Sequence, residues 1–386
     1  MIKIGLRNNL LYPLLLIIFT FFRRILSVVI SELLKFESSL SFLTFLMFFS
    51  EFITGLIIYI YQLKFIKHNK KTNSKKSRIK YLVLNNKMSY HDSKFKIYLL
   101  IFIATYFDFV EFILTSYYFP QFENISKSLI IRLGSALTLS SFILYYFLLK
   151  IEIYNHHKFS IIIIFVCLLL IIILEISFNI IYQTLNENHF IIIFLIIISL
   201  FFIGFQDNIE KYLLEFNFIN PFEMLMIEGL FGIILTFIYS FIENPIDNII
   251  EFYQKEKTIK IIYLIICLTL FIILSGGRNS YRILTNRLYS PMTKAIADSF
   301  LDPLLILYYF FMGIDFKFKN EKNILYFISN LILSLIILFG GIVYSELLVI
   351  YHFNLEKNTH YEVARRASDV ESISIVDNIE MLSSNL

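Results

Sequence analysis

Ionisable residues inside apolar segments are the part of this sequence that could do chemistry. Glu51 and Glu228 each lie in the middle of a hydrophobic run, and each is followed four residues later by a glycine, Gly55 and Gly232. A charged side chain at the centre of a bilayer costs about 2.5 to 3.5 kcal/mol on insertion scales, so such groups usually face a bundle interior, a partner or a water-filled path. These acids are candidates for a transport pathway, with hydrogen bonds between packed helices as the structural alternative.

Two arginines on one helical face indicate a negatively charged partner. Arg278 and Arg282 are four residues apart, so they repel each other unless an anion lies between or opposite them. The preceding pair Gly276-Gly277 would let the backbone approach a ligand or open the helix. Acids in the segment 291–312 are the structural alternative to a bound anion.

Other ionisable groups at membrane depth complete the candidate set. Lys294 precedes Asp298 by four residues, so the two could neutralise each other within one helix. Groups that could instead reach the headgroups from near helix ends are Arg23, Arg24, Arg132, Asp207 and Lys211. We predict substrate-binding roles for Arg132, Gln206, Arg278, Arg282 and Lys294. We predict coupling or structural roles for Glu51, Asp108, Glu228 and Asp298.

The sequence contains no arrangement typical of a catalytic or metal site. Its seven histidines lie in loops, at the boundaries of apolar runs or in the tail, without metal-ligand spacing to Cys or Asp. The adjacent His156 and His157 should point to different sides of a helix. There is no P-loop and no GxSxG motif. We therefore expect a protein that is not an enzyme, with no cofactor and no bound metal.

The composition is that of an integral membrane protein in the lipid bilayer. Of the 386 residues, 58% are hydrophobic, and the mean hydropathy is +0.71, outside the range of soluble domains. A membrane helix needs about 20 apolar residues, which predicts an all-α polytopic fold with ten transmembrane helices. We place them near 10–33, 41–62, 97–118, 127–149, 158–178, 189–212, 221–242, 260–284, 291–312 and 324–349.

Two parts of the chain resemble each other. MFFSEFITGLIIYIY from Met47 matches MLMIEGLFGIILTFIY from Met224, and FILYYFLLKIEI from Phe142 matches LILYYFFMGIDF from Leu305. Ten segments then divide into five and five, and an odd number in each half inverts the second half relative to the first. We expect two inverted five-helix repeats, at 1–180 and 181–350, with Glu51 and Glu228 equivalent and their glycines allowing close helix approach.

Charge in the loops predicts orientation. The segment 63–96 carries eleven Lys/Arg and one acid, so the positive-inside rule places it in the cytosol. Both termini then lie in the cytosol, and 351–386 is a polar tail that we expect to be disordered. A basic run next to a helix end sets topology more often than it binds nucleic acid, and we expect no nucleic-acid partner.

Three stretches resemble one transporter superfamily. GFQDNIEKYLLEFNFINPFEMLMIEGLFG (204–232) is similar to the sixth and seventh spans of EamA-like drug/metabolite transporters of the solute carrier 35 type, subfamily F, which are related to nucleotide-sugar transporters. TKAIADSF (293–300) resembles their ninth span, where Lys294 and Asp298 take the basic and acidic positions. IIRLGSALTLSSFILYYFLL resembles their fourth span, with Arg132 as the match. One departure is Leu301-Asp302, where subfamily members often carry a second basic residue after the aspartate.

The resemblance implies alternating access around a central cavity lined by spans 1–4 and 6–9. We predict a secondary transporter in an endomembrane (Golgi, ER or a lysosome- or vacuole-like organelle) for a small anionic solute such as a nucleotide sugar or a phosphorylated or carboxylated metabolite. Arg278→Gln or Arg282→Gln should then weaken anion binding with little change in stability. A proton-coupled exporter of cationic or zwitterionic solutes is the first alternative. A membrane scaffold or receptor without flux is the second, and pairing into a homodimer stays open.

Overall fold

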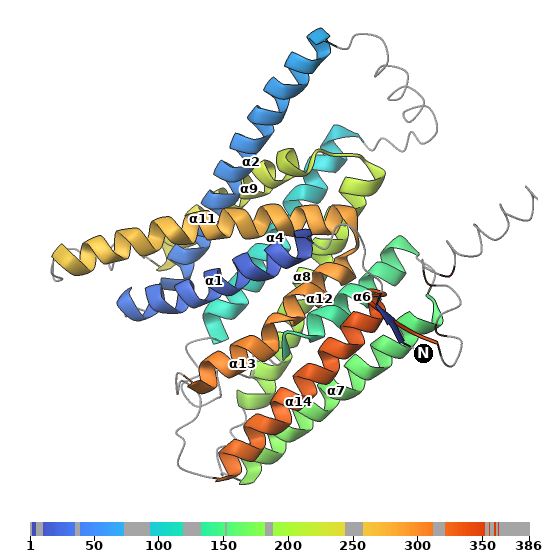
Figure 1. Ribbon diagram of the computed structural model, residues 1–386. Coiled ribbons are helices and arrows are strands. Elements are labelled where there is room, and N and C mark those ends of the chain that lie inside the picture. The colour runs from blue at the N-terminus through green and yellow to red at the C-terminus, as the bar shows by residue number, and fades with distance from the viewer. Residues whose placement is uncertain are drawn as a thin grey trace, which may run out of the picture.

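The computed structural model describes residues 2–4, 11–34, 39–72, 93–118, 133–150, 153–181, 188–243, 258–311 and 321–351, together with positions 355, 359 and 362. Helices dominate these residues, as Figure 1 shows. The helices are α1 (Leu11–Leu34), α2 (Ser39–Thr72), α4 (Lys94–Tyr118), α6 (Ala136–Leu149), α7 (Asn155–Ile181), α8 (Asn188–Phe216), α9 (Pro221–Glu243), α11 (Thr258–Leu288), α12 (Pro291–Ser299), α13 (Leu301–Phe311) and α14 (Glu321–Tyr344).

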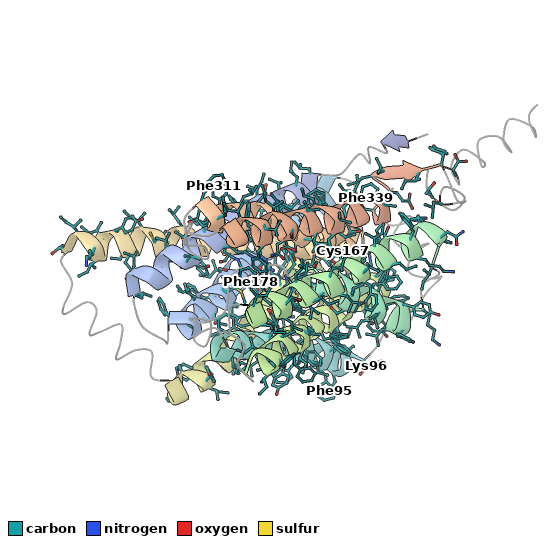
Figure 2. The ribbon with its side chains drawn as sticks, turned by 90° about the horizontal axis from the view of Figure 1, so that it is seen from below. Phe95, Lys96, Cys167, Phe178, Phe311 and Phe339 are labelled. Carbon is teal, nitrogen blue, oxygen red and sulfur yellow. The ribbon has the colours of Figure 1, made fainter. Side chains whose placement is uncertain are left out.

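Eight of the described helices are long and apolar enough to cross a membrane, namely α1, α2, α4, α7, α8, α9, α11 and α14. Large apolar side chains also cover the outside of the bundle, where Phe95, Phe311 and Phe339 project in Figure 2. A water-soluble monomer rarely exposes an apolar surface of this extent, whereas lipid tails suit it. The structure therefore supports an integral, polytopic membrane protein.

Each of the ten predicted segments overlaps a described helix, but the bounds of several differ, and the second, 41–62, continues in α2 to Thr72. The ninth, 291–312, is broken at Phe300 into α12 and α13, because Pro303 has no N–H to donate to the carbonyl of Ser299. The fourth begins at Ala136, and the predicted residues 127–132 lie outside the described part of the chain. The tenth, 324–349, ends as a helix at Tyr344.

A two-stranded sheet is a small departure from the all-α prediction. β1 (Ile2–Ile4) pairs antiparallel with β2 (Leu348–Ile350), which follows α14. This pairing places residues 2–4 at the end of the bundle where α14 finishes, and Figure 1 shows the strands beside the ends of α6 and α7. Residues 2–4 and 348–350 therefore lie at one end of the bundle.

Helices from the two predicted repeats pack mainly against each other. The main partners are α1 with α11, α2 with α9, α4 with α8, α6 with α8 and α12, and α7 with α14. Figure 1 shows α7 and α14 running side by side along one edge of the bundle. The two halves therefore form one interdigitated bundle.

Glycines bring α2 and α9 into close contact, as predicted. A Cβ built on Gly55 would lie 2.6 Å from the backbone nitrogen of Met226, and one built on Gly232 would overlap the ring of Phe48. Gly229 in turn faces the backbone of Phe52. Each helix therefore contributes glycines to one crossing point, and no larger side chain fits there without moving a neighbour.

The adjacent glycines of α11 have a different role from the one expected. A Cβ on Gly276 would collide with Thr54 of α2, and a Cβ on Gly277 would collide with Phe19 of α1. The helix continues unbroken from Thr258 to Leu288 through both positions. These glycines therefore pack α11 against two neighbouring helices, and the helix does not open there.

Candidate functional site

A cluster of charged side chains lies where four helices meet. Arg282 of α11 is 2% exposed. Its Nη1 donates to Glu210 of α8, and its Nη2 donates to Glu228 of α9 at 3.2 Å. The same Nη2 lies 3.7 Å from Oε1 of Glu51 on α2. One guanidinium therefore joins three carboxylates from three other helices.

Asn286 extends this cluster by one helical turn. It lies four residues after Arg282, on the same face of α11. Its amide nitrogen donates to Oε2 of Glu210 at 3.2 Å and to the backbone carbonyl of Asp207 at 2.8 Å. Glu210 is thus held from two successive turns of α11.

A second buried pair joins α8 to α12. Lys294 donates to Oδ2 of Asp207 at 2.9 Å, and its Nζ lies 3.2 Å from Asp298. The pair that the four-residue spacing allows is therefore present, and Asp207 adds a partner that the spacing alone did not indicate. Asp207 and Lys294 are both buried, so Asp207 does not reach toward headgroups.

Lys211 is also buried, and it caps the end of α11. Its Nζ donates to the backbone carbonyls of Arg287 at 3.2 Å and Tyr289 at 2.9 Å. The last carbonyls of a helix have no partner within the helix and carry partial negative charge. Lys211 therefore supports the turn into α12 from inside the bundle and does not reach to the membrane surface, which the sequence had left open.

Three arginines at depth have no carboxylate within 4 Å among the described residues, and these are Arg23, Arg24 and Arg278. Arg278 donates instead to Oδ1 of Asn279 at 2.8 Å, and Arg23 donates to the sulfur of Met47 at 3.2 Å. All three are half-buried. Among the described cations at membrane depth, these three arginines are therefore the most available to bind an anion.

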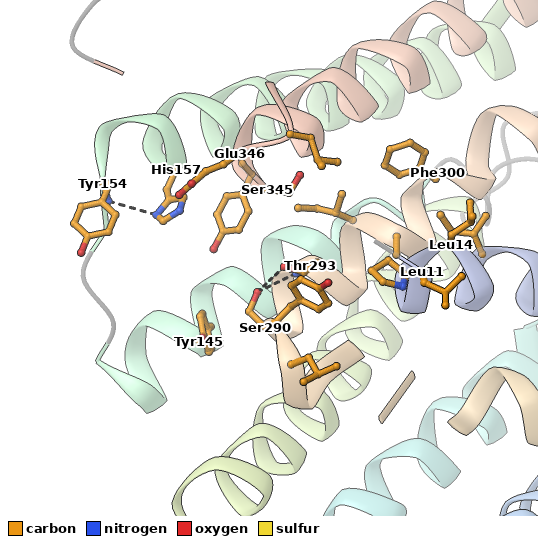
Figure 3. Close-up of a pocket in the computed structure, with 18 residues that line it drawn as sticks. Leu11, Leu14, Tyr145, Tyr154, His157, Ser290, Thr293, Phe300, Ser345 and Glu346 are labelled. Atoms are coloured by element: carbon orange, nitrogen blue, oxygen red, sulfur yellow. Dashed lines mark hydrogen bonds between the residues drawn. The ribbon is translucent and has the colours of Figure 1, made fainter. Parts of the chain in front are cut away.

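A cavity of about 880 Å³ lies at the end of the bundle where α1 and α12 begin and where α11 and α14 finish. Figure 3 shows His157 and Glu346 on one side of it and Leu11 and Leu14 of α1 on the other. The hydroxyls of Ser290 and Thr293 face the space, together with four tyrosines. These tyrosines are Tyr145, Tyr154, Tyr289 and Tyr344.

Among the predicted binding residues that the structure describes, none lines this cavity. Gln206, Arg282 and Lys294 are buried between helices, and Arg278 is half-buried. Lys294 adjoins the lining residue Thr293 in sequence. Arg132 lies outside the described residues. The structure therefore joins Arg282 to Glu51 and Glu228, and Lys294 to Asp298, but it does not place these groups around the open space.

Sequence reasoning missed one group of side chains beside the cavity. His156 and His157 begin α7, and Glu346 lies in the turn after α14, far along the chain. The two rings lie 4.0 Å apart between centroids, so they do not diverge as expected of neighbours in a helix.

No protein-family model matches the chain, and no curated protein matches it either.

Proposed function

We propose that the protein is a secondary transporter that moves a small organic solute across a membrane by alternating access. The observation that carries this proposal is the cavity at one end of the bundle. Its walls come from α1, α6 and α7 of the first predicted repeat and from α11, α12 and α14 of the second. Relative movement of two repeats around such a space is how many transporters expose a site to one side at a time.

The pattern of helix packing supports two inverted repeats of five helices. If each helix is replaced by its counterpart in the other predicted repeat, α1 becomes α8 and α11 becomes α4. The α1–α11 pair then becomes the α8–α4 pair, and these two helices also pack against each other. The same exchange leaves the pairs α2 with α9, α6 with α12 and α7 with α14 as they are. A pseudo-two-fold relation predicts this set of pairs, and it agrees with the resemblance to drug/metabolite transporters.

A broken helix beside the cavity is a second supporting feature. The α12–α13 break lies at Phe300, which lines the cavity, and Asp298 and Asp302 flank it. Transporters often build their sites at interrupted helices, whose free termini and unpaired backbone groups bind solute or ion. We place the deeper part of the transport path at this break.

Arginines without carboxylate partners favour an anionic solute. Arg278 lies ten residues, about 15 Å of helix rise, deeper along α11 than the lining residue Leu288. Arg23 and Arg24 offer two more guanidinium groups, which suit bidentate recognition of phosphate or carboxylate.

One observation favours the proton-coupled alternative. Three carboxylates surround the single guanidinium of Arg282, so the cluster carries two uncompensated negative charges when all three are ionised. Neither oxygen of Glu51 has a hydrogen-bond partner. Buried charge of this kind is costly, and a proton is the smallest cation that could neutralise it. A scaffold without flux would use the same contacts for packing alone.

Flux through the cavity is the direct test. The purified protein is placed in liposomes, and uptake is measured for nucleotide sugars, phosphorylated and carboxylated metabolites, and cationic aromatic solutes. Thr293→Phe narrows the cavity, and Thr269→Phe makes the same change on an exposed face of α11. We expect uptake of one anionic class that Thr293→Phe abolishes and Thr269→Phe retains. Absence of uptake for every class would favour the scaffold.

Topology is tested by labelling from opposite sides of sealed membranes. Single cysteines are placed in the predicted cytosolic segment 63–96 and in 243–259. The natural Cys167 and Cys267 are buried, so they add little background. We expect the two engineered sites to react from opposite sides, and reaction of both from one side would overturn the inverted repeat. Organelle fractionation of the tagged protein tests the proposed endomembrane location.

A further inference from the structure

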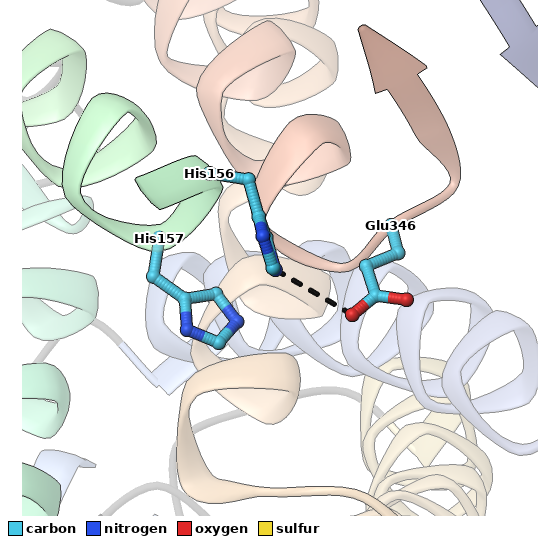
Figure 4. A group of neighbouring side chains, drawn as sticks. All are labelled: His156, His157 and Glu346. Carbon is cyan, nitrogen blue, oxygen red and sulfur yellow. Dashed lines mark ion pairs between the residues drawn. The ribbon is translucent and has the colours of Figure 1, made fainter. Parts of the chain in front are cut away.

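A cluster of two histidines and one carboxylate lies at the mouth of the cavity. We propose that His156, His157 and Glu346 bind a divalent transition-metal ion, for which Zn²⁺ is the best match. One ligand atom from each residue lies within 4.8 Å of the other two, and Figure 4 shows the three side chains converging from α7 and from the turn after α14. This site is independent of whether the protein transports a solute.

The spacing of the ligand atoms fits a shared ion. Nε2 of His156 and Oε1 of Glu346 are 3.5 Å apart, beyond the usual range of a direct hydrogen bond. Two ligands of a tetrahedral zinc, each at about 2.1 Å from the metal, lie about 3.4 Å from one another. The ring of His157 lies 4.5 Å from the ring of Tyr344 between centroids, which holds it beside the other two ligands.

His156 has unused coordinating capacity. Its side chain is 3% exposed, and neither of its ring nitrogens has a hydrogen-bond partner. A buried polar nitrogen without a partner is unfavourable and therefore unusual. Coordination would satisfy one nitrogen, whereas the competing explanation is a protonated His156 that only forms an ion pair with Glu346.

The backbone conformation of Glu346 also indicates that its side chain has a role. Its φ is 58°, a left-handed conformation that helix C-terminal positions usually give to glycine. Its N–H donates to the carbonyl of Val343 at 3.2 Å, and the next N–H donates to Ile342 at 3.1 Å. A glutamate at a position that favours glycine indicates a role for its side chain. That side chain extends toward α7.

Three protein ligands leave the metal with an open position. Two histidines and a glutamate form a ligand set found in zinc sites that retain one exchangeable ligand. His157 and Glu346 line the cavity, so the open position would face it and could accept water or an anionic group. The ion would also tie the start of α7 in the first predicted repeat to the end of α14 in the second.

The test uses the full chain in detergent, purified through a tag without histidine and stripped with a chelator. Zn²⁺ alone is titrated, and bound metal is counted after removal of free ion. We expect one Zn²⁺ per chain and a higher thermal unfolding temperature. His156→Ala and Glu346→Gly should each weaken binding at least about tenfold, whereas His189→Ala, in the first turn of α8, should not change it.

Glu346→Gly separates metal binding from simple pairing, because glycine suits the left-handed backbone at this position while the carboxylate is lost with the rest of the side chain. We expect the metal-free variant to be as stable as the parent and to lose the Zn²⁺-dependent rise in unfolding temperature. A variant that is destabilised without metal, in a parent that takes up no Zn²⁺, would overturn the site in favour of the ion pair. Co²⁺ added to the unaltered protein needs no variant to fold, and absence of the visible absorption bands of a four- or five-coordinate site would also overturn it.

Discussion

Two polar regions of this bundle differ in what fills the space between their side chains. Around Arg282 the space is filled by protein, because Glu51, Glu210 and Glu228 surround the guanidinium. Around Thr293 the space is open, and its lining consists of hydroxyls, aromatic rings and aliphatic side chains with few charges. The charge-rich region is closed, and the open region is mostly neutral.

The difference shows that a charged side chain at membrane depth is more readily explained by an oppositely charged side chain of the same protein than by a bound ligand. A guanidinium inside a bundle must be neutralised in the empty protein as well as in the loaded one. Arg282 meets this requirement with acids of its own chain, and Lys294 does so with Asp207 and Asp298. Arg278 forms no ion pair with the described residues, so it is the better candidate for binding an anion.

The largest effect is expected where the closed region loses its cation. Arg282→Gln leaves three buried carboxylates without a positive charge, and breaking a buried ion pair in this way costs about 3–5 kcal/mol. These contacts reverse the expectation from spacing alone that stability would change little. Thermal unfolding in detergent and the yield of monodisperse protein measure the loss.

Arg287→Gln is the matched control, because Arg287 is exposed on the last turn of the same helix. It should unfold at nearly the temperature of the parent. If Arg282→Gln were equally stable but failed to bind an anionic solute, the closed region would be a binding site after all.

A smaller loss is expected where the closed region depends on close helix approach. Gly55→Ala places a methyl group against the backbone of Met226, and such overpacking costs about 1–3 kcal/mol. In Gly340→Ala the new atom would lie 3.2 Å from a side-chain carbon of Ile164, and alanine favours a helix over glycine by about 1 kcal/mol. We expect only Gly55→Ala to lower the unfolding temperature. Equal stability of the two would mean that α2 and α9 tolerate a wider separation.

Removing one acid from the closed region should cost less than removing its arginine. Glu51→Gln and Glu228→Gln each keep a polar side chain and reduce the excess of negative charge around Arg282, so we expect a change of about 1 kcal/mol or less in stability. Uptake driven by a pH gradient should fall comparably in both, because the two acids hold equivalent positions in the predicted repeats. Glu215→Gln, on an exposed position of α8, is the control. Unchanged uptake and expression in both would show that the repeat records ancestry without a present role.

Much of the fold follows from the sequence because apolar length is read directly from single segments. Predicted ranges such as 158–178 and 221–242 coincide closely with α7 and α9. The close approach at Gly55 was also predicted and is confirmed. The pair of Lys294 with Asp298, which the spacing allowed as an alternative to substrate binding, is present. The break at Phe300 had a signal in Pro303 that a count of apolar residues overlooks.

The site was harder to predict because its contacts join distant parts of the chain. Spacing showed that Arg282 needs a partner, but it offered only nearby acids in 291–312, whereas the partners come from α2, α8 and α9. His156 and Glu346 have no common motif, and only the packing of α7 against α14 brings them together. Helix pairing therefore had to be known before either cluster could be found.

The smallest change in stability, and the sharpest test of the comparison, is expected at Arg278. Its guanidinium is half-buried and has no carboxylate within ion-pair distance among the described residues, so Arg278→Gln should alter stability by about 1 kcal/mol or less. A charged hydrogen bond to an anion contributes about 1.5–3 kcal/mol, so binding of the transported anion should weaken about tenfold to a hundredfold. Arg278→Lys keeps the charge but loses the bidentate geometry, so its affinity for the anion should lie between that of the parent and that of Arg278→Gln. Equilibrium binding and uptake by the reconstituted protein measure these effects against unfolding of the empty protein. If Arg278→Gln unfolds like Arg282→Gln, the two arginines belong to one closed network, and the anion must be bound by the neutral lining of the cavity.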